Sequence, residues 1–242
     1  MSKHDQIAQC LTEDILQGQY RPGERLPSER DLAARFDANR GAVREAMKKL
    51  EHLGIACVQP GGARVVPLNE ASLDIIEPLL DLGNVPDREL VDNIMQVIEG
   101  LVHVALEATI TEASDEQLAE IRKLVRPLCG DDLDQEAHGI ASFALMQGIM
   151  TSNSNLVSQL IARGLMLRLG PKLLPLHEHS SIDIAAHRVY AQQLDTALAR
   201  RDMTGIRGVF SAFFKLNREA LKRAYAAYEA AQPSNGQEVA AR

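Results

Sequence analysis

The chain has few cysteines and no long apolar run. Its three cysteines lie far apart and form no CxxC pair, which excludes a disulfide framework and a cysteine zinc site. No apolar run reaches the length of about 18 residues that a spanning helix needs, so we expect no membrane partner. The first residues lack the basic start and apolar stretch of a signal peptide, which favours a cytoplasmic protein.

The length and the charge distribution favour two domains of different character. A chain of 242 residues with 45% apolar residues is long enough for two buried cores. The net charge is −7, but the acidity lies in the later part of the chain. Between Arg30 and Lys49 six basic residues stand against three acidic ones. This local basic excess suits contact with a phosphate backbone, although such runs are more often solvated surface.

The first 66 residues show the pattern of a winged helix-turn-helix. Ser28 and Asn39 are good N-caps for the second and third helices, which we expect to end near Phe36 and Leu53. A first helix and two strands with a glycine-rich tip complete the unit; the expected ranges are 4–17 for that helix and 56–59 and 63–66 for the strands. The order of helix, helix, turn, helix and hairpin is that of a winged helix-turn-helix.

The third helix carries the residue types of a DNA-reading helix. Such a helix presents residues near its N-terminus to base edges in the major groove, where arginine binds guanine with two hydrogen bonds. A glycine tip of the hairpin fits the minor groove. The alternative is that Arg40 and Arg44 form only surface salt bridges, for example with Glu45.

The motifs LPSERDLA (26–33), RGAVREA (40–46) and PGGARVV (60–66) resemble the GntR family of bacterial regulators. The resemblance implies DNA contacts from seven positions: Arg30, Asn39, Arg40, Gly41, Ala42, Arg44 and Gly61. It also implies a homodimer that binds a short palindromic operator in double-stranded DNA. The segment Asn39-Arg40-Gly41 departs from the family's usual Ser-Arg followed by Thr or Pro, which puts the operator preference in doubt.

The rest of the chain reads as helix. We expect a mainly α protein with the winged domain at 1–66, a connector at 67–85, an all-α antiparallel bundle at 86–230 and a disordered tail at 231–242. The clearest helical stripe is that of Leu90, Ile94, Val97, Leu101 and Val104.

Three segments of the bundle resemble the FadR subfamily of GntR proteins, whose FCD-type domain binds the effector. They are LVDNIMQV (90–97), SNSNLVSQLI (152–161) and HRVYAQQLDTALARRD (187–202). Many members hold a metal with one Asp and three His. Here only His187 matches, and Ile140, Ala144 and Phe213 replace the other three ligands. One imidazole cannot hold a metal, so we expect neither a metal nor another cofactor.

Two alternatives concern the histidines. His187 is more simply interpreted as a hydrogen-bonded core residue. His138, His177 and His179 are an improbable second zinc site, because the geometry of their proline-flanked segment is uncertain.

Loss of the metal removes the anchor for a small carboxylate and leaves an apolar pocket. Such a pocket suits a fatty acyl or acyl-CoA-like effector, and the resemblance to acyl-responsive members points the same way. The expected ligand-binding residues are Ile140, Phe143, Ala144, His187, Phe213, Phe214, Asn217 and Leu221. The alternative effector is a small organic acid, and the simplest alternative is that the aromatic residues only pack the core.

Three classes of function remain distinct. We expect a ligand-responsive DNA-binding regulator and not an enzyme. A metal-dependent enzyme using the segment 177–187 lacks a nucleophile with its base. An architectural DNA-binding protein would not need the large helical domain.

Overall fold

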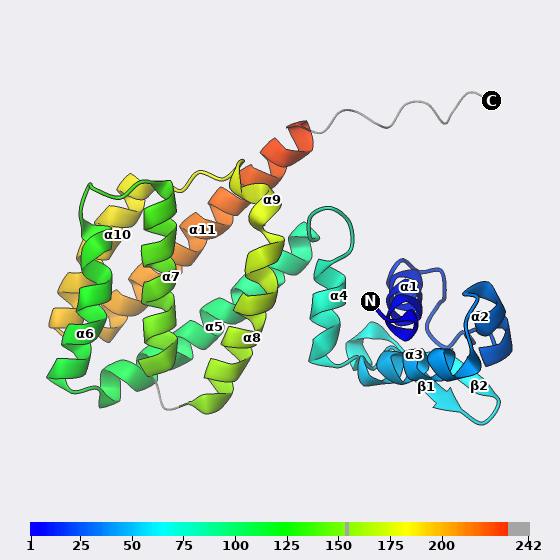
Figure 1. The fold of residues 1–242 in the computed structure, drawn as a ribbon. Helices are drawn as coiled ribbons and strands as arrows, with labels where there is room; N and C mark the ends of the chain where they lie inside the picture. Colours follow the sequence, from blue (N-terminus) through cyan, green and yellow to red (C-terminus); the bar gives the residue numbers. More distant parts are fainter. Residues whose placement is uncertain (153–154, 232–242) are drawn as a thin grey trace. The chain divides into compact units, whose positions relative to one another are not determined.

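The computed structural model describes residues 1–152 and 155–231 and forms two compact units that divide between Pro86 and Asp87 (Figure 1). The described residues are mainly helical, with one two-stranded antiparallel sheet, so the predicted fold class is confirmed. The expected connector, residues 67–85, belongs to the first unit. Apart from Ala231, the expected tail lies outside the described residues.

The first unit begins with three capped helices. Side-chain oxygens of Ser2, Ser28 and Asn39 accept the backbone N–H three residues later and so satisfy one free donor of each first turn. The elements are α1 (Lys3–Leu16), α2 (Glu29–Arg35), α3 (Arg40–His52), β1 (Ala56–Gln59), β2 (Gly62–Val65), the short 3-10 turns η1 (Leu68–Glu70) and η2 (Leu73–Ile75), and α4 (Ile76–Leu80).

The core of this unit lies between α1, α2, α3 and the hairpin. Ile7, Leu11, Val43 and Leu50 are fully buried there, at the helical spacing seen in the sequence. Removing such apolar side chains from water contributes about 1.5–3 kcal/mol each. The segment before α2 pairs with the outer side of β2, where Leu26 N–H donates to the carbonyl of Ala63.

The connector packs against the segment at which α3 ends. Gly54 has a φ of 72°, and a Cβ there would lie 2.9 Å from the backbone N of Ser72, so only glycine fits. Ser72 N–H donates to the carbonyl of Leu53, and Ile75 joins the core.

The second unit is a helical bundle (Figure 1). Its elements are α5 (Arg88–Glu112), α6 (Asp115–Val125), η3 (Arg126–Cys129), α7 (Gln135–Ser152), α8 (Leu156–Lys172), α9 (Leu174–His177), α10 (Ile184–Ala199) and α11 (Met203–Ala231). Helix α5 packs against α7, α8 and α11, and α10 packs against α11, α6 and η3.

The buried face of α5 differs from the predicted stripe. Val97 and Val104 are about half exposed, whereas Ile98, Val102 and Ala105 are buried. Apolar residues surround much of this helix, so their spacing alone did not select the face that packs. By length and composition, α5 is the one helix among the described residues that could cross a membrane, a test that core helices also pass.

Candidate functional site

The N-terminus of α3 is exposed and ordered by its cap. The Oδ1 atom of Asn39 accepts the N–H of Ala42 at 2.8 Å. Gly41 is exposed, and a Cβ there would lie only 3.1 Å from that Oδ1 atom, so glycine preserves the cap. Helix N-termini attract anions because their first N–H groups have no partner within the helix, so this end is suited to a phosphate.

Two of the predicted arginines are exposed cations at the starts of α2 and α3. Arg30 lies in the first turn of α2, and Arg40 is the first residue of α3. Both side chains are exposed, and within residues 1–152 and 155–231 neither forms an ion pair. Each guanidinium is therefore available to a phosphate or a guanine.

Arg44 is already paired, but with a different partner from the one considered in the sequence. Its Nε atom donates to both carboxylate oxygens of Glu29 at 3.0 Å, and Glu45 instead pairs with Lys48 at 2.8 Å. The Arg44 side chain is 65% exposed, so the salt bridge is screened by water and weak. Arg44 remains within reach of a ligand that can replace the carboxylate.

The wing tip carries a positive charge that the sequence did not reveal. Gly61 and Gly62 have φ values of 102° and 126°, which L side chains rarely adopt. The guanidinium of Arg25 lies beside them, since a Cβ on Gly62 would approach its Nε atom to 2.9 Å. Arg64 on β2 donates to the carbonyl of Gly23 at 2.8 Å. Only the pairing of residues 23–26 with β2 brings Arg25 to the tip.

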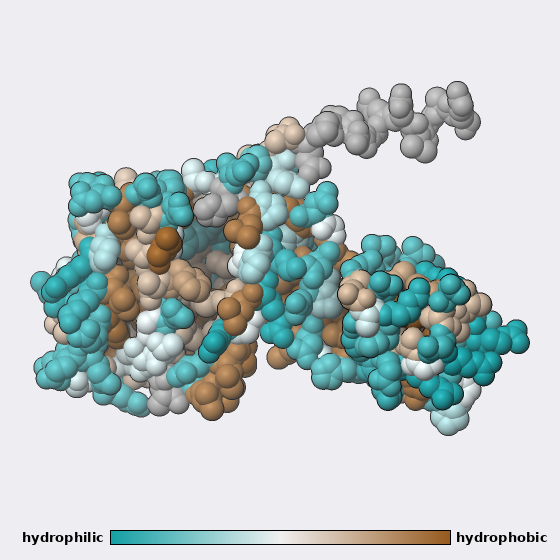
Figure 2. Space-filling view, in the orientation of Figure 1, coloured by the Kyte–Doolittle hydropathy of each residue, from teal (hydrophilic) through white to brown (hydrophobic). Residues whose placement is uncertain are grey.

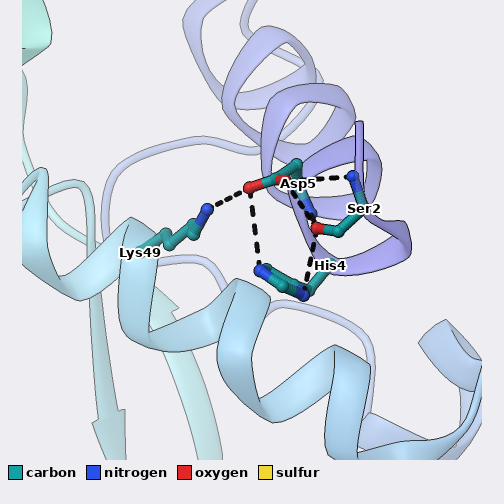
Figure 3. A network of polar contacts seen from close by, with 4 residues as sticks. All are labelled: Ser2, His4, Asp5 and Lys49. Carbon is teal, nitrogen blue, oxygen red and sulfur yellow. Dashed lines mark hydrogen bonds and ion pairs between the residues drawn. The ribbon is translucent and has the colours of Figure 1, made fainter.

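A polar network fixes α3 against α1 (Figure 3). Lys49 in the last turn of α3 donates to Asp5 of α1, which also accepts the N–H of Ser2 at 3.1 Å. Lys49 and then Ser2 hold the pKa of the Asp5 carboxyl well below its usual range. His4 lies beside the carboxylate at 3.7 Å. The C-terminal end of α3 is therefore held while its N-terminal end is exposed.

The second unit contains a small cavity of about 40 Å³ between α7, η3, α10 and α11. Its lining comprises Leu128, Ser142, Leu145, Met146, His187, Phe210, Phe213, Phe214 and Asn217. The ring of His187 lies edge-on to that of Phe213 and to that of His138, with centroids 5.2 and 5.0 Å apart. Burial, and then His138, lowers the pKa of His187 to about 4, so this imidazole is neutral at pH 7.

Four of the eight expected ligand-binding residues line this cavity: His187, Phe213, Phe214 and Asn217. Ile140 and Phe143 are 64% and 54% exposed on the other side of α7, and Ala144 and Leu221 are absent from the lining. The side chains of α7 that line the cavity are Ser142, Leu145 and Met146, and His138 of the same helix contacts His187. A shift of two residues turns a side chain by about 200° around a helix, so the expected register placed the wrong face inward.

The residues around His187 do not fit the metal site of one Asp and three His that many FadR-type proteins have. With His138 there are two imidazoles at this position, fewer than the three or four ligands that a metal needs, and Ser142, Met146 and Phe213 stand where the further ligands would be needed. No group of three His, Cys, Asp or Glu side chains in the described part of the chain could hold a metal ion. The side chain of His177, one of the three histidines of the second zinc hypothesis, lies outside the described residues.

Comparisons with known proteins agree with the geometry of the first unit. Residues 3–66 match the family model of bacterial regulatory proteins, gntR family. The HTH-type transcriptional regulator Mce2R of Mycobacterium tuberculosis is 33% identical over 120 residues, which cover 48% of this chain and 49% of that protein. The galactonate operon transcriptional repressor of Escherichia coli is 28% identical over 165 residues, covering 66% and 70%.

A solved structure supports the fold alone. It is that of Lar, described as controlling the expression of the Listeria monocytogenes agr system; it has a TM-score of 0.52 at 18% identity and covers 93% of this chain and 98% of its own. The present chain spans about half the length of Mce2R. The family match and the exposed helix end beside a glycine wing tip together identify residues 3–66 as a domain of the gntR family of bacterial regulatory proteins.

Proposed function

We propose that the chain is a sequence-specific, DNA-binding transcriptional regulator of the GntR type. The observation that carries the proposal is the exposed end of α3, where Arg40 has no ion-pair partner among the described residues and Asn39 fixes the first turn. Arg40 and Arg44 read base edges in the major groove, Arg30 binds a phosphate or a base, and the tip at Gly61 enters the minor groove. Asn39, Gly41 and Ala42 permit the close approach of α3.

The DNA partner is a short palindrome and the protein is a homodimer, because one winged helix reads only one half-site. Helix α8 offers a surface for the second copy. Four of its large apolar side chains are 60–65% exposed: Leu156, Val157, Leu160 and Leu167. Figure 2 shows apolar surface over α8. Covering these side chains in a dimer would remove a patch that a monomer rarely exposes.

The helical unit is the effector domain, and we propose that it is of the FadR type. A fatty acyl or acyl-CoA-like ligand is favoured by the apolar lining from Phe210, Phe213 and Phe214. A chain of this kind needs more room than about 40 Å³, so its binding would part α7 from α11. A small organic acid is the second candidate, because one relative is the repressor of the galactonate operon.

The effector acts by population shift. A ligand that binds one arrangement of the helical unit more tightly changes the affinity of the winged domain for DNA. The connector, residues 67–85, is the covalent path between the units. Its helix α4 packs against α1. We place the protein in the cytoplasm, where its DNA is. An enzymatic role for the segment 177–187 has no supporting observation, and the relatives above are regulators.

The test is selection of binding sites by the full chain from a randomised double-stranded DNA library. We expect enrichment of a short palindrome. Replacement of Arg40 by Ala should weaken binding to the enriched site by about 1–3 kcal/mol if this arginine reads a base. Arg35 is the matched control, because its guanidinium is paired with Asp14 of α1 at 2.9 Å. Failure to enrich any site would contradict the proposal, and enriched sites without symmetry would contradict the dimer.

A further inference from the structure

His187 lines the cavity of the helical unit, and His138 packs against His187 from outside the lining; each imidazole has an unused hydrogen-bonding atom. His138 and His187 are 1% and 2% exposed. The Nε2 atom of His138 and the Nδ1 atom of His187 are buried and have no hydrogen-bond partner among the described residues. Buried polar atoms are nearly always paired, because leaving one unpaired loses the hydrogen bond that water would make. The unpaired Nδ1 atom belongs to a residue that lines the cavity, so it indicates a polar group of a ligand there.

The lining of this cavity is uncharged; the carboxylate of Asp183, which acts on His187, lies at the N-cap of α10 and outside the lining. The cavity lining has no Asp, Glu, Lys or Arg, and its other polar side chains are Ser142 and Asn217. The Oγ atom of Ser142 lies 3.4 Å from Nδ1 of His138. Burial lowers the pKa of both histidines, so neither supplies a positive charge at pH 7. An anion placed here would lose its hydration without gaining a counter-charge.

We infer that this cavity accepts an uncharged ligand, whose hydroxyl or carbonyl group hydrogen-bonds to Nδ1 of His187 and whose apolar part lies against Phe210 and Phe213. The inference rests on the proposed function, since it names the class of effector for the same site. It favours an alcohol, ester or thioester over a free carboxylate or phosphate. Met146 is the lining side chain best able to change conformation, because an unbranched thioether can repack around ligands of different shape.

The inference separates the two effector classes considered above. The carbonyl of an acyl thioester is uncharged and can accept a hydrogen bond from Nδ1 of His187, whereas a small organic acid brings a carboxylate. A neutral imidazole has one donor and one acceptor nitrogen, and its tautomer decides which is which, so Nδ1 of His187 can pair with either a hydroxyl or a carbonyl. Ligand chemistry at this position is thus set by the absence of charge in the described lining.

The experiment titrates the full chain, labelled with ¹³C at the methionine methyl groups, with matched pairs of a straight-chain alcohol and its carboxylate from two to eight carbons. The Met146 signal, assigned with Met146→Leu, reports binding at the cavity wall. We expect at least one alcohol to shift this signal saturably and its carboxylate to bind about tenfold more weakly or not at all. Methyl esters of the same carboxylates should behave as the alcohols do.

Controls distinguish the site from the surface and from unfolding. His187→Phe and, separately, Ser142→Ala should weaken alcohol binding, the former by about tenfold. His103→Phe alters a half-buried histidine on α5 that contacts Ser211 of α11 and should leave binding unchanged. Carboxylates that bind as tightly as the alcohols, or a signal that no probe shifts, would overturn the inference. Site selection on random DNA is independent of these outcomes and tests the proposed function separately.

Discussion

Arg44 of α3 and Glu29 of α2 face each other across the helix-turn-helix, with the Nε atom of Arg44 3.0 Å from both oxygens of the Glu29 carboxylate. The two side chains are 65% and 42% exposed, so the pair contributes little to stability. Its more important effect is on orientation, because the guanidinium is held in one position, one helical turn after Arg40, before DNA arrives. A guanine or phosphate can then compete with the carboxylate for Arg44.

The first prediction concerns this competition. Glu29→Gln removes a negative charge from the DNA-facing surface and frees Arg44. We expect affinity for random duplex DNA to rise severalfold and the ratio of specific to non-specific binding to fall, because phosphate contacts carry no sequence information. Binding to the selected site and to random duplex DNA, each measured over a range of salt, gives both quantities. Glu45→Gln, which releases Lys48 instead, is the control, and an equal loss of specificity in both variants would contradict the role of Glu29.

The wing tip provides the second prediction. In Gly62→Ala the new Cβ meets Arg25 and the backbone must keep a φ of 126°, so we expect a loss of about 1 kcal/mol in stability and a distorted tip that binds DNA more weakly. Gly18→Ala has a φ of 78° but open space around the Cβ, and it should cost stability without affecting DNA binding. Urea unfolding and operator affinity measure the two effects, and unchanged affinity in Gly62→Ala would exclude the tip from the interface.

The third prediction tests which face of α7 points inward. The triple variant Ser142→Asp, Met146→His and Phe213→His places new ligands beside His187, so we expect it to retain about one Zn²⁺ per chain after dialysis. A control with the same three residue types at Ile140, Ala144 and Phe213 should retain none, because Ile140 is 64% exposed. Metal content by mass spectrometry decides between them. Equal zinc content in the two variants would show that the face of α7 with Ser142 and Met146 does not line the cavity.

The fourth prediction is a pH dependence of stability. His187 has a pKa of about 4 in the folded chain against an ordinary value of 6.5, so the unfolded chain binds more protons between these values. Stability is therefore fully present above pH 6.5 and is lost as pH falls toward 4, by at most about 1.4 kcal/mol per pH unit. Burial lowers the pKa of His138 also, which adds to the loss.

The measurement is urea unfolding followed by helical circular dichroism at pH 7.0, 6.0 and 5.0. His187→Phe keeps an aromatic ring beside Phe213 and removes the titrating group, so its stability should fall less steeply over the same interval. Carboxylates titrate equally in both proteins, and the difference between the two slopes isolates His187. Parallel slopes would mean that the imidazole is not buried as a neutral group.

The sequence by itself predicted the helices and the hairpin of residues 1–66 and the helical class of the second unit. Ser28 and Asn39 cap α2 and α3 because a short polar side chain can reach the N–H three residues on, an interaction that needs no tertiary partner. The exposed arginines at the start of α3 follow from the same local signals. Glycines at the tip fix the hairpin in a similar way, since positive φ values are a property of single residues.

Only the tertiary structure decided which helical faces are buried and which distant residues meet. Helix α7 has apolar residues on every side, so its periodicity gave no preference between the face of Ile140 and that of Ser142. Packing against α5 and α6 made that choice. Arg25 reaches the wing, and His138 meets His187, only because segments far apart in the chain pack together. Local propensity is encoded within a few residues, whereas burial depends on the partner that each surface finds.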